Sequence, residues 1–216
     1  MTEHKANEKG ALRRSRTSHA ERTANMRKRL IDAAIECLNE VGLGMTTLQR
    51  ITDRAKVSRG AFVHHFPTRV DLLIAVAEHA AVAQNTHVRR RLAHLQPGMQ
   101  IFEAITMATW EAIVQPTAIA LLEIMIGARS DTELARRFRP LIDRLEADQR
   151  EAVWEQAQLA GIQDRDTILT MVHLHMAAMR GLALELMYSE DKSAADASMQ
   201  LLQRYKARLT QDLTQA

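Results

Sequence analysis

The stretch TTLQRITDRAKVSRGAFVHHFPTRVDLL, residues 46–73, places three helix starts close together. Thr46 or Thr47, then Ser58, and then Thr68 each precede a short run with the helical spacing of apolar residues, and serine and threonine are favoured N-cap residues. The first two of these helices are too short to be stable alone in water. Longer neighbouring helices must therefore hold them, and this requirement constrains the fold.

The rest of the chain favours long helices. Glycine (8) and proline (4) are scarce and aromatic residues make up 4%, so little in the composition favours strands or frequent turns. Pro140 is expected to kink or split one segment. We therefore predict an all-α fold, with helical spacing of apolar residues over 26–41, 69–91, 99–114, 117–129, 131–160, 164–188 and 194–214.

Charge is distributed unevenly along the chain. Residues 1–93 hold 17 Lys and Arg against 9 Asp and Glu, a net charge of +8, whereas residues 94–216 hold 12 against 17, a net charge of −5. A basic part joined to an acidic part indicates a polyanionic partner at one end only. Residues 1–22 carry six basic residues without apolar periodicity, so we expect a disordered basic tail, either a solvated leader or an arm on DNA phosphates.

The number of cysteines and the length of the charge-free stretches bear on the cellular compartment. Cys37 is the only cysteine, which fits a reducing cytoplasm. The longest charge-free stretches, 112–122 and 167–179, are too short to span a bilayer, and the first residues do not resemble a secretory signal. We expect a cytoplasmic protein without a membrane partner.

The second short helix has two distinct faces. Phe62 and Phe66, four residues apart, can anchor it on the preceding helices, while the opposite face offers a basic and acid-free surface. Two short helices joined by a tight turn match the helix-turn-helix plan, in which a short helix enters the major groove. The exposed face consists of Arg59, Ala61, Val63 and His64.

The same stretch resembles the DNA-binding segment of the TetR family of bacterial transcriptional regulators. The residues that match are Thr47, Ile51, Ala55, Val57, Ser58, Arg59, Gly60, Phe62, Phe66, Pro67 and Arg69. The resemblance implies an N-terminal three-helix helix-turn-helix domain, linked by a long fourth helix to a C-terminal helical bundle that dimerises. The expected parts are the tail at 1–22, the DNA-binding domain at 23–80, and the ligand-binding and dimerisation domain at 81–216.

The resemblance also assigns roles to residues. Thr47, His65 and Arg69 should contact phosphate, and the groove should receive Ser58, Arg59, Gly60, Ala61, Val63 and His64. Lys56 stands where the family usually has a turn glycine. A left-handed backbone there would cost about 1 kcal/mol, and the side chain could add a phosphate contact. Val63 replaces an aromatic residue and could pack against a thymine methyl group.

The segment 164–188 is the most apolar long stretch, with apolar residues all round its axis. Such a helix is buried on more than one side, by its own core and by a second subunit or else by a large monomeric core. The family's last two helices form a dimer interface, which agrees with the first alternative. The candidate interface residues are Ala177, Ala178, Gly181, Leu201 and Tyr205.

The family's remaining helices usually enclose a cavity for an unidentified small molecule. Methionine adapts to irregular shapes, so a loosely selective cavity and a plain core both fit the pattern. The candidate ligand-binding residues are Phe102, Met107, Trp110, Met125, Met171, His175, Met176 and Met179.

Other classes of function lack their motifs. The sequence has no G-x-S-x-G, P-loop or H-E-x-x-H, and His173 and His175 point to opposite sides of a helix, so neither an enzyme nor a metal or other cofactor is expected. A helical protein-interaction module without specific DNA binding is the alternative, with an enzyme behind it. The sequence therefore predicts a ligand-responsive homodimer that binds a palindromic double-stranded DNA operator; the family resemblance adds that it is a repressor.

Overall fold

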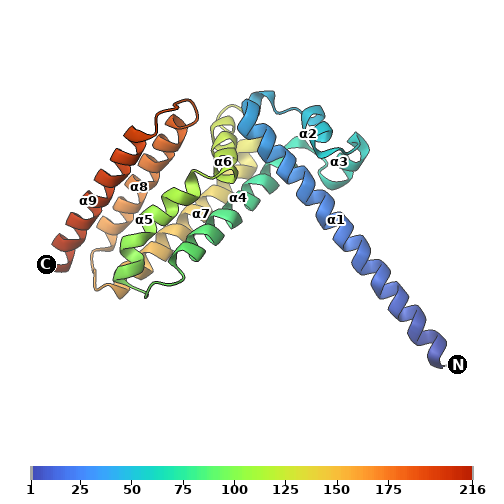
Figure 1. Ribbon diagram of the computed structural model, residues 1–216, viewed down its shortest axis with the longest axis horizontal. Helices are drawn as coiled ribbons and strands as arrows, with labels where there is room; N and C mark the ends of the chain where they lie inside the picture. The colour runs from blue at the N-terminus through green and yellow to red at the C-terminus, as the bar shows by residue number, and fades with distance from the viewer. Residues whose placement is uncertain (1, 216) are drawn as a thin grey trace. The chain divides into compact units, whose positions relative to one another are not determined.

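The computed structural model describes the backbone of residues 2–215 and the side chains of residues 20–215. Over this range the chain forms nine helices (Figure 1), which confirms the predicted all-α fold. They are α1 (Thr2–Met45), α2 (Leu48–Ala55), α3 (Arg59–His65), α4 (Arg69–Leu92), α5 (Met99–Ile113), α6 (Pro116–Gly127), α7 (Thr132–Leu159), α8 (Arg165–Glu185) and α9 (Ser193–Gln215).

Helix α1 contains a break at Gly42. Its φ of 69° lies in the region that favours glycine, while its ψ of 173° is extended, so Gly42 is not a left-handed helical cap. The helix also runs through residues 2–22, where a disordered tail was expected. This segment contains many good helix formers and no proline, so it can continue the helix upstream. The side chains of residues 1–19 lie outside the described ones, and DNA contact by the tail stays a prediction.

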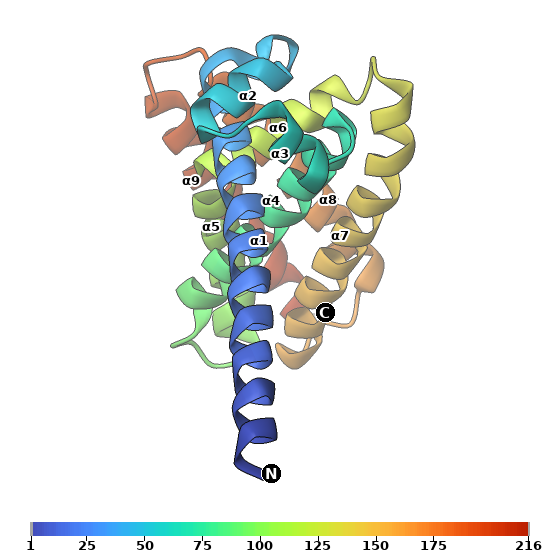
Figure 2. The same ribbon diagram turned by 90° about the vertical axis from the view of Figure 1, so that its right-hand side faces the viewer.

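The chain divides into two compact units between Ala75 and Val76, inside α4, whereas the predicted boundary was 80/81. In the first unit, α2 and α3 group around the C-terminal part of α1 (Figure 2). Their shared core includes Leu30, Ile51 and Phe62, each at most 2% exposed. These side chains are far apart in sequence and hold the short helices that could not stand alone.

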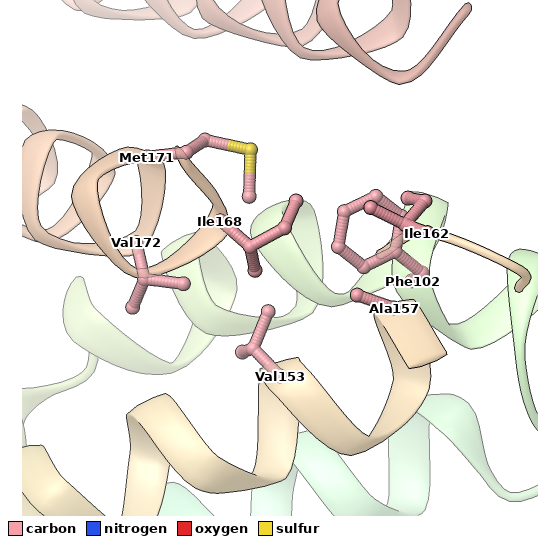
Figure 3. Packing of buried hydrophobic residues seen from close by; sticks show 7 residues of the cluster. All are labelled: Phe102, Val153, Ala157, Ile162, Ile168, Met171 and Val172. Atoms are coloured by element: carbon pink, nitrogen blue, oxygen red, sulfur yellow. The ribbon is translucent and has the colours of Figure 1, made fainter. Parts of the chain in front are cut away.

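In the second unit, α5, α7 and α8 share one apolar cluster (Figure 3). Phe102 from α5, Val153 from α7 and Ile168 from α8 are all buried there. A second cluster joins α5, α8 and α9 through Trp110, Met179 and other apolar side chains. Helix α8 therefore contributes to both clusters, as its apolar sequence predicted.

Helix α7 passes through Pro140 without a break, so a split at Pro140 is wrong, while the alternative of a kink stays a prediction. Proline removes one backbone hydrogen bond, but Pro140 is exposed and water can reach the carbonyl group that loses its donor. The neighbouring Phe138 and Leu141 are buried and keep the helix against its own unit.

Helix α8 is long and apolar enough, by length and composition, to cross a membrane. The core helix of a globular protein passes the same test. The buried side of α8 consists of Ile168, Met171, Val172, His175, Met179 and Ala183.

Candidate DNA-binding surface and ligand cavities

Local sequence sets both ends of α3. The Ser58 hydroxyl accepts a hydrogen bond from the Ala61 backbone N–H at 3.1 Å, which confirms Ser58 as the N-cap. Phe66, the residue before Pro67, is extended (φ −138°, ψ 97°), as residues before proline usually are, and α3 ends there. Helix α2 is capped by Thr47, whose side chain accepts from the Arg50 N–H at 3.2 Å.

The turn between α2 and α3 contains the one departure from the family pattern that involves backbone strain. Lys56 is left-handed (φ 52°, ψ 50°) and its N–H donates to the carbonyl groups of Thr52 and Asp53. A side chain in this conformation costs about 1 kcal/mol relative to glycine. The ammonium group is exposed, on the turn that precedes α3.

Helix α1 braces both short helices with two arginines that the sequence analysis did not single out. Arg29 Nη2 donates to the carbonyl oxygen of Ala55 at 2.5 Å, at the C-terminus of α2. Arg27 Nη1 donates to the carbonyl oxygen of His65 at 3.1 Å, at the C-terminus of α3, and its guanidinium lies 4.3 Å from the centre of the Phe66 ring. Cations favour helix C-termini, so the two contacts fix α2 and α3 to α1.

The anchoring face of α3 is as predicted. Phe62 is 2% exposed and Phe66 is fully buried, with 6.1 Å between their ring centroids. The opposite face is open to solvent, because Arg59, Val63 and His64 are all exposed. The structure therefore brings most predicted DNA-binding residues to one accessible region: Thr47, Lys56, Ser58, Arg59, Gly60, Val63 and His64 are exposed, and Ala61 and His65 are half-buried.

Two predicted phosphate ligands, Arg69 and His65, have features that do not depend on DNA. The Arg69 guanidinium donates from Nη2 to the carbonyl oxygen of Leu43 at 2.7 Å and from Nε to that of Thr46 at 3.3 Å. Burial lowers the pKa of His65, with smaller contributions from His64 and Arg27, so a positive charge on His65 is disfavoured. Phosphate contact by both residues stays a prediction, and Arg69 also has a structural role.

The predicted ligand residues divide into two groups. Met171, His175, Met176 and Met179 converge on a cavity of about 20 Å³ between α5, α7 and α8, together with Lys206 of α9. That volume is close to one water molecule. Phe102 and Trp110 pack instead in the two apolar clusters, Met107 packs against the second one, and Met125 is half-buried on α6.

A larger cavity of about 420 Å³ lies between α8 and α9. It shares Met171, His175 and Lys206 with the small cavity. Its remaining lining is mainly apolar and consists of Leu174, Leu202, Tyr205 and Leu209. Polar residues line it towards the N-terminus of α8, namely Asp166, Thr167 and Thr170. This size falls within the usual range for a small organic ligand, which is roughly 300–1,000 Å³.

Lys206 is a polar residue at the junction of these cavities that the sequence analysis missed. It is 4% exposed, and its Nζ donates to the Phe102 carbonyl oxygen and, at 3.1 Å, to Thr106 Oγ1. Thr106 Oγ1 in turn lies 3.4 Å from Nδ1 of His175. Burial lowers the pKa of Lys206 to about 7, and burial together with Lys206 lowers the pKa of His175 to about 4. His175, a predicted ligand residue, is thus neutral at physiological pH.

A third cavity, of about 670 Å³, lies among α4, α5 and the start of α6. Its lining includes His87, Arg90, Arg91 and His94. Arg91 holds Glu111 through two hydrogen bonds of 2.6 and 3.1 Å, and this pairing lowers the pKa of Glu111. The carboxylate of Glu111 therefore already neutralises part of the positive charge at this cavity.

The predicted dimer residues lie on an open face. Along α8, Leu174, Ala177, Gly181 and Leu184 are exposed at helical spacing, and Ala178 is half-buried. Along α9, Leu201 is 40% and Tyr205 is 64% exposed. Figure 1 shows α8 and α9 side by side, so both helices contribute apolar side chains that this chain leaves uncovered.

Known proteins share both the motif and the fold. The family profile described as bacterial regulatory proteins, tetR family, matches residues 30–76. The transcriptional regulator CymR of Pseudomonas putida is 28% identical over 177 residues, which cover 82% of this chain and 87% of that protein. The structure of Salmonella enterica GusR has a TM-score of 0.64 at 23% identity and covers 89% of this chain and 96% of its own. A regulator from Saccharomonospora viridis in complex with choline has a TM-score of 0.67 at 13% identity, covering 84% and 95%.

A helix-turn-helix held by α1 and presenting the exposed face of α3 defines a DNA-binding transcriptional regulator. The chain belongs to the TetR family, which consists of regulators and not of enzymes.

Proposed function

We propose that this regulator is a homodimeric repressor that binds a palindromic operator and is released by a small, mainly apolar molecule. The observation that carries the DNA-binding part is the geometry of α3, anchored by Phe62 and Phe66 and presenting Arg59 on its open face. Arginine can read a guanine edge through two hydrogen bonds, whereas an arginine paired inside the protein could not.

The exposed apolar residues on α8 and α9 support pairing of two chains. Leu174, Leu184 and Tyr205 are 60%, 41% and 64% exposed, and large exposed apolar patches mark interaction surfaces. The small residues Ala177 and Gly181 between them would allow two helices to approach closely. A two-fold dimer would place two copies of α3 on half-sites about one DNA turn apart, which explains the expected palindrome.

The cavity between α8 and α9 supports the ligand response. Its volume of about 420 Å³ and apolar lining suit a small organic molecule better than the 20 Å³ cavity that is lined by half of the predicted ligand residues. The Saccharomonospora viridis regulator shows that a small molecule can occupy a protein of this fold. A cytoplasmic location follows from this function, because the operator DNA lies there.

Selection of bound sequences from random duplex DNA tests the proposal with the purified full-length protein. We expect an enriched palindrome whose half-sites are one turn apart, and binding that weakens steeply with added salt. Arg59→Ala should lose the enrichment at one position of each half-site, while Arg139→Ala, which removes an exposed arginine of α7, serves as the matched control. Enrichment of no sequence by the wild-type protein would favour the protein-interaction alternative.

A further inference from the structure

Lys206 places an amino group inside the second unit. Its Nζ donates to the Phe102 carbonyl oxygen and to Thr106 Oγ1 and lies 4.4 Å from the centre of the Phe102 ring. These contacts come from one side, the α5 side. An ammonium group has three donors, and these two acceptors use two of them.

No carboxylate pairs with this group among the described side chains. Glu103, next to Phe102 on α5, favours the charged form from a distance but is exposed and forms no ion pair with Lys206. Asp166, at the first turn of α8, is exposed at the edge of the cavity. His175 is neutral. Burying a charge without a counter-ion is costly, so the amino group of Lys206, with its pKa lowered to about 7, is only partly protonated at neutral pH, and a bound anion would stabilise its charged form.

The cavity between α8 and α9 reaches this group. Lys206 and His175 are buried residues of its lining, whereas Leu174 and Tyr205 are exposed at its edge. Around them lie Met171, Leu202 and Leu209, whose side chains are apolar and flexible or branched. The cavity thus combines an apolar wall with one buried amino group, which a bound anion would hold in its charged form.

We propose that this cavity binds a small amphipathic monocarboxylate, with its carboxylate paired to the Lys206 ammonium and its apolar part between α8 and α9. The proposal rests on the ligand response in the proposed function and names the chemical class of that ligand. The carboxylate would supply the counter-ion that the chain does not provide, and charge-assisted hydrogen bonds are roughly twice as strong as neutral ones.

The charge balance distinguishes this class from others. One ammonium neutralises one negative charge, so a phosphate with nearly two charges would remain partly unneutralised against the apolar wall. A cationic ligand would be repelled by Lys206. A neutral ligand would gain the apolar contacts only.

Leu174 and Tyr205 also belong to the face proposed for pairing of two chains. A second copy of the chain would therefore close the cavity over its ligand.

Calorimetry on the full chain without DNA tests the site with straight-chain carboxylates from hexanoate to dodecanoate and with their neutral amides. The carboxylate that binds best should bind at least about tenfold more tightly than its amide. Lys206→Met should abolish this preference and retain part of the binding of the amide, because methionine keeps the apolar length. Lys192→Met removes an exposed lysine and is the matched control, with the preference unchanged.

Three results would overturn the assignment. They are binding of no carboxylate in the series by the wild-type protein, equal affinity for carboxylate and amide, and a preference that survives in Lys206→Met. The first two need no variant, so they hold even if Lys206→Met were to fold poorly. Carboxylate binding that leaves operator affinity unchanged would keep the site and contradict the ligand-released repressor, so the two proposals fail separately.

Discussion

The guanidinium of Arg69 donates to the carbonyl oxygen of Leu43, with 2.7 Å between Nη2 and that oxygen. A second hydrogen bond, from Nε, reaches the Thr46 carbonyl oxygen. The first residue of α4 thereby fixes the connection between α1 and α2, where backbone acceptors follow the break at Gly42. Arg69 is a structural brace as well as a predicted phosphate ligand, and this changes what its substitution should do.

Arg59→Ala and Arg69→Ala should affect DNA binding differently. Loss of Arg59 should cost about 1–3 kcal/mol on the best operator and relax the base preference at one position, because Arg59 makes no side-chain contact within the described residues that would be lost. Loss of Arg69 should weaken binding to all sequences alike and also lower the free energy of unfolding by about 1–3 kcal/mol, because two carbonyl groups each lose a charged donor. Competition binding and urea unfolding measure the two effects.

One result for each variant would contradict the role assigned to its arginine. An Arg59→Ala protein that loses affinity equally for operator and random DNA would show that Arg59 contacts phosphate. An Arg69→Ala protein with unchanged stability would show that its carbonyl contacts contribute little.

Lys56→Gly should raise stability while it weakens DNA binding. Glycine tolerates φ 52° without strain, although the more flexible unfolded chain offsets part of the gain, so we expect an increase of about 0.5–1 kcal/mol in the free energy of unfolding. Loss of the charge should reduce the salt slope of DNA binding by about 1. Lys56→Ala separates the effects, since it removes the charge and keeps the strain. If both variants bind DNA like the wild-type protein, Lys56 has no phosphate contact.

The sequence predicted what depends on local pattern. The positions of Ser58, Phe62 and Pro67 fix the start, the buried face and the end of α3 through interactions within a few residues, and the structure agrees. The braces made by Arg27 and Arg29 could not be predicted in the same way, because their acceptors are backbone carbonyls 38 and 26 residues away. Such acceptors exist in every sequence and leave no pattern.

The position of Lys206 in the sequence indicates that its side chain is buried. It falls on the same helical stripe as the apolar residues Met199, Leu202 and Leu209, where a lysine is out of place. The stripe indicates burial but not the partners, since Phe102 is 104 residues away in the chain. Of the two threonines that could begin α2, Thr46 or Thr47, the sequence alone did not select one. Thr46 is buried and donates to the Gly42 carbonyl oxygen, so the neighbouring threonine caps α2.

Gly181→Glu should disrupt pairing without disturbing the fold of one chain. Gly181 is exposed, and a Cβ atom added there meets nothing within 4 Å, so the chain itself leaves room for the new side chain. In a dimer through α8 and α9, the glutamate would be buried opposite apolar residues without a partner. Sedimentation at micromolar concentration should show a dimer for the wild-type protein and a monomer for the variant. Ala152→Glu, on the exposed side of α7, is the control and should remain dimeric. A monomeric wild-type protein would end this proposal.

Lys206→Met should change how stability depends on pH. The folded-state pKa of Lys206, about 7, lies below its ordinary value of 10.5, so the unfolded chain binds more protons between these values. The stability of the wild-type protein should therefore gain from Lys206 as the pH rises across this window. The variant lacks this gain, and its stability relative to the wild type should be greatest below pH 7.

Urea unfolding at about pH 7.5 and about pH 9.5 measures this difference. Each pKa unit corresponds to about 1.4 kcal/mol, so a change of a few kcal/mol between the two proteins is expected. Titration of His175 does not interfere, because its pKa of about 4 and its ordinary value of 6.5 both lie below the window. A stability difference that is the same at both pH values would show that Lys206 stays protonated in the folded protein.

Ligand and operator should weaken each other's binding by the same factor. Release requires the ligand to bind the DNA-incompetent state more tightly, and a coupling of about 1–3 kcal/mol would give a useful switch. Helix α4 is the natural element to transmit this coupling, because its first residues belong to the DNA-binding unit and its last residues to the unit that holds the cavities.

Calorimetry with the carboxylate that binds most tightly, in the absence and presence of the selected operator, measures the factor by which the operator weakens carboxylate binding. Operator titrations with and without that carboxylate measure the factor by which the carboxylate weakens operator binding. Thermodynamic linkage demands equal factors, so equal carboxylate affinity with and without operator would refute release by this ligand even if the cavity binds it.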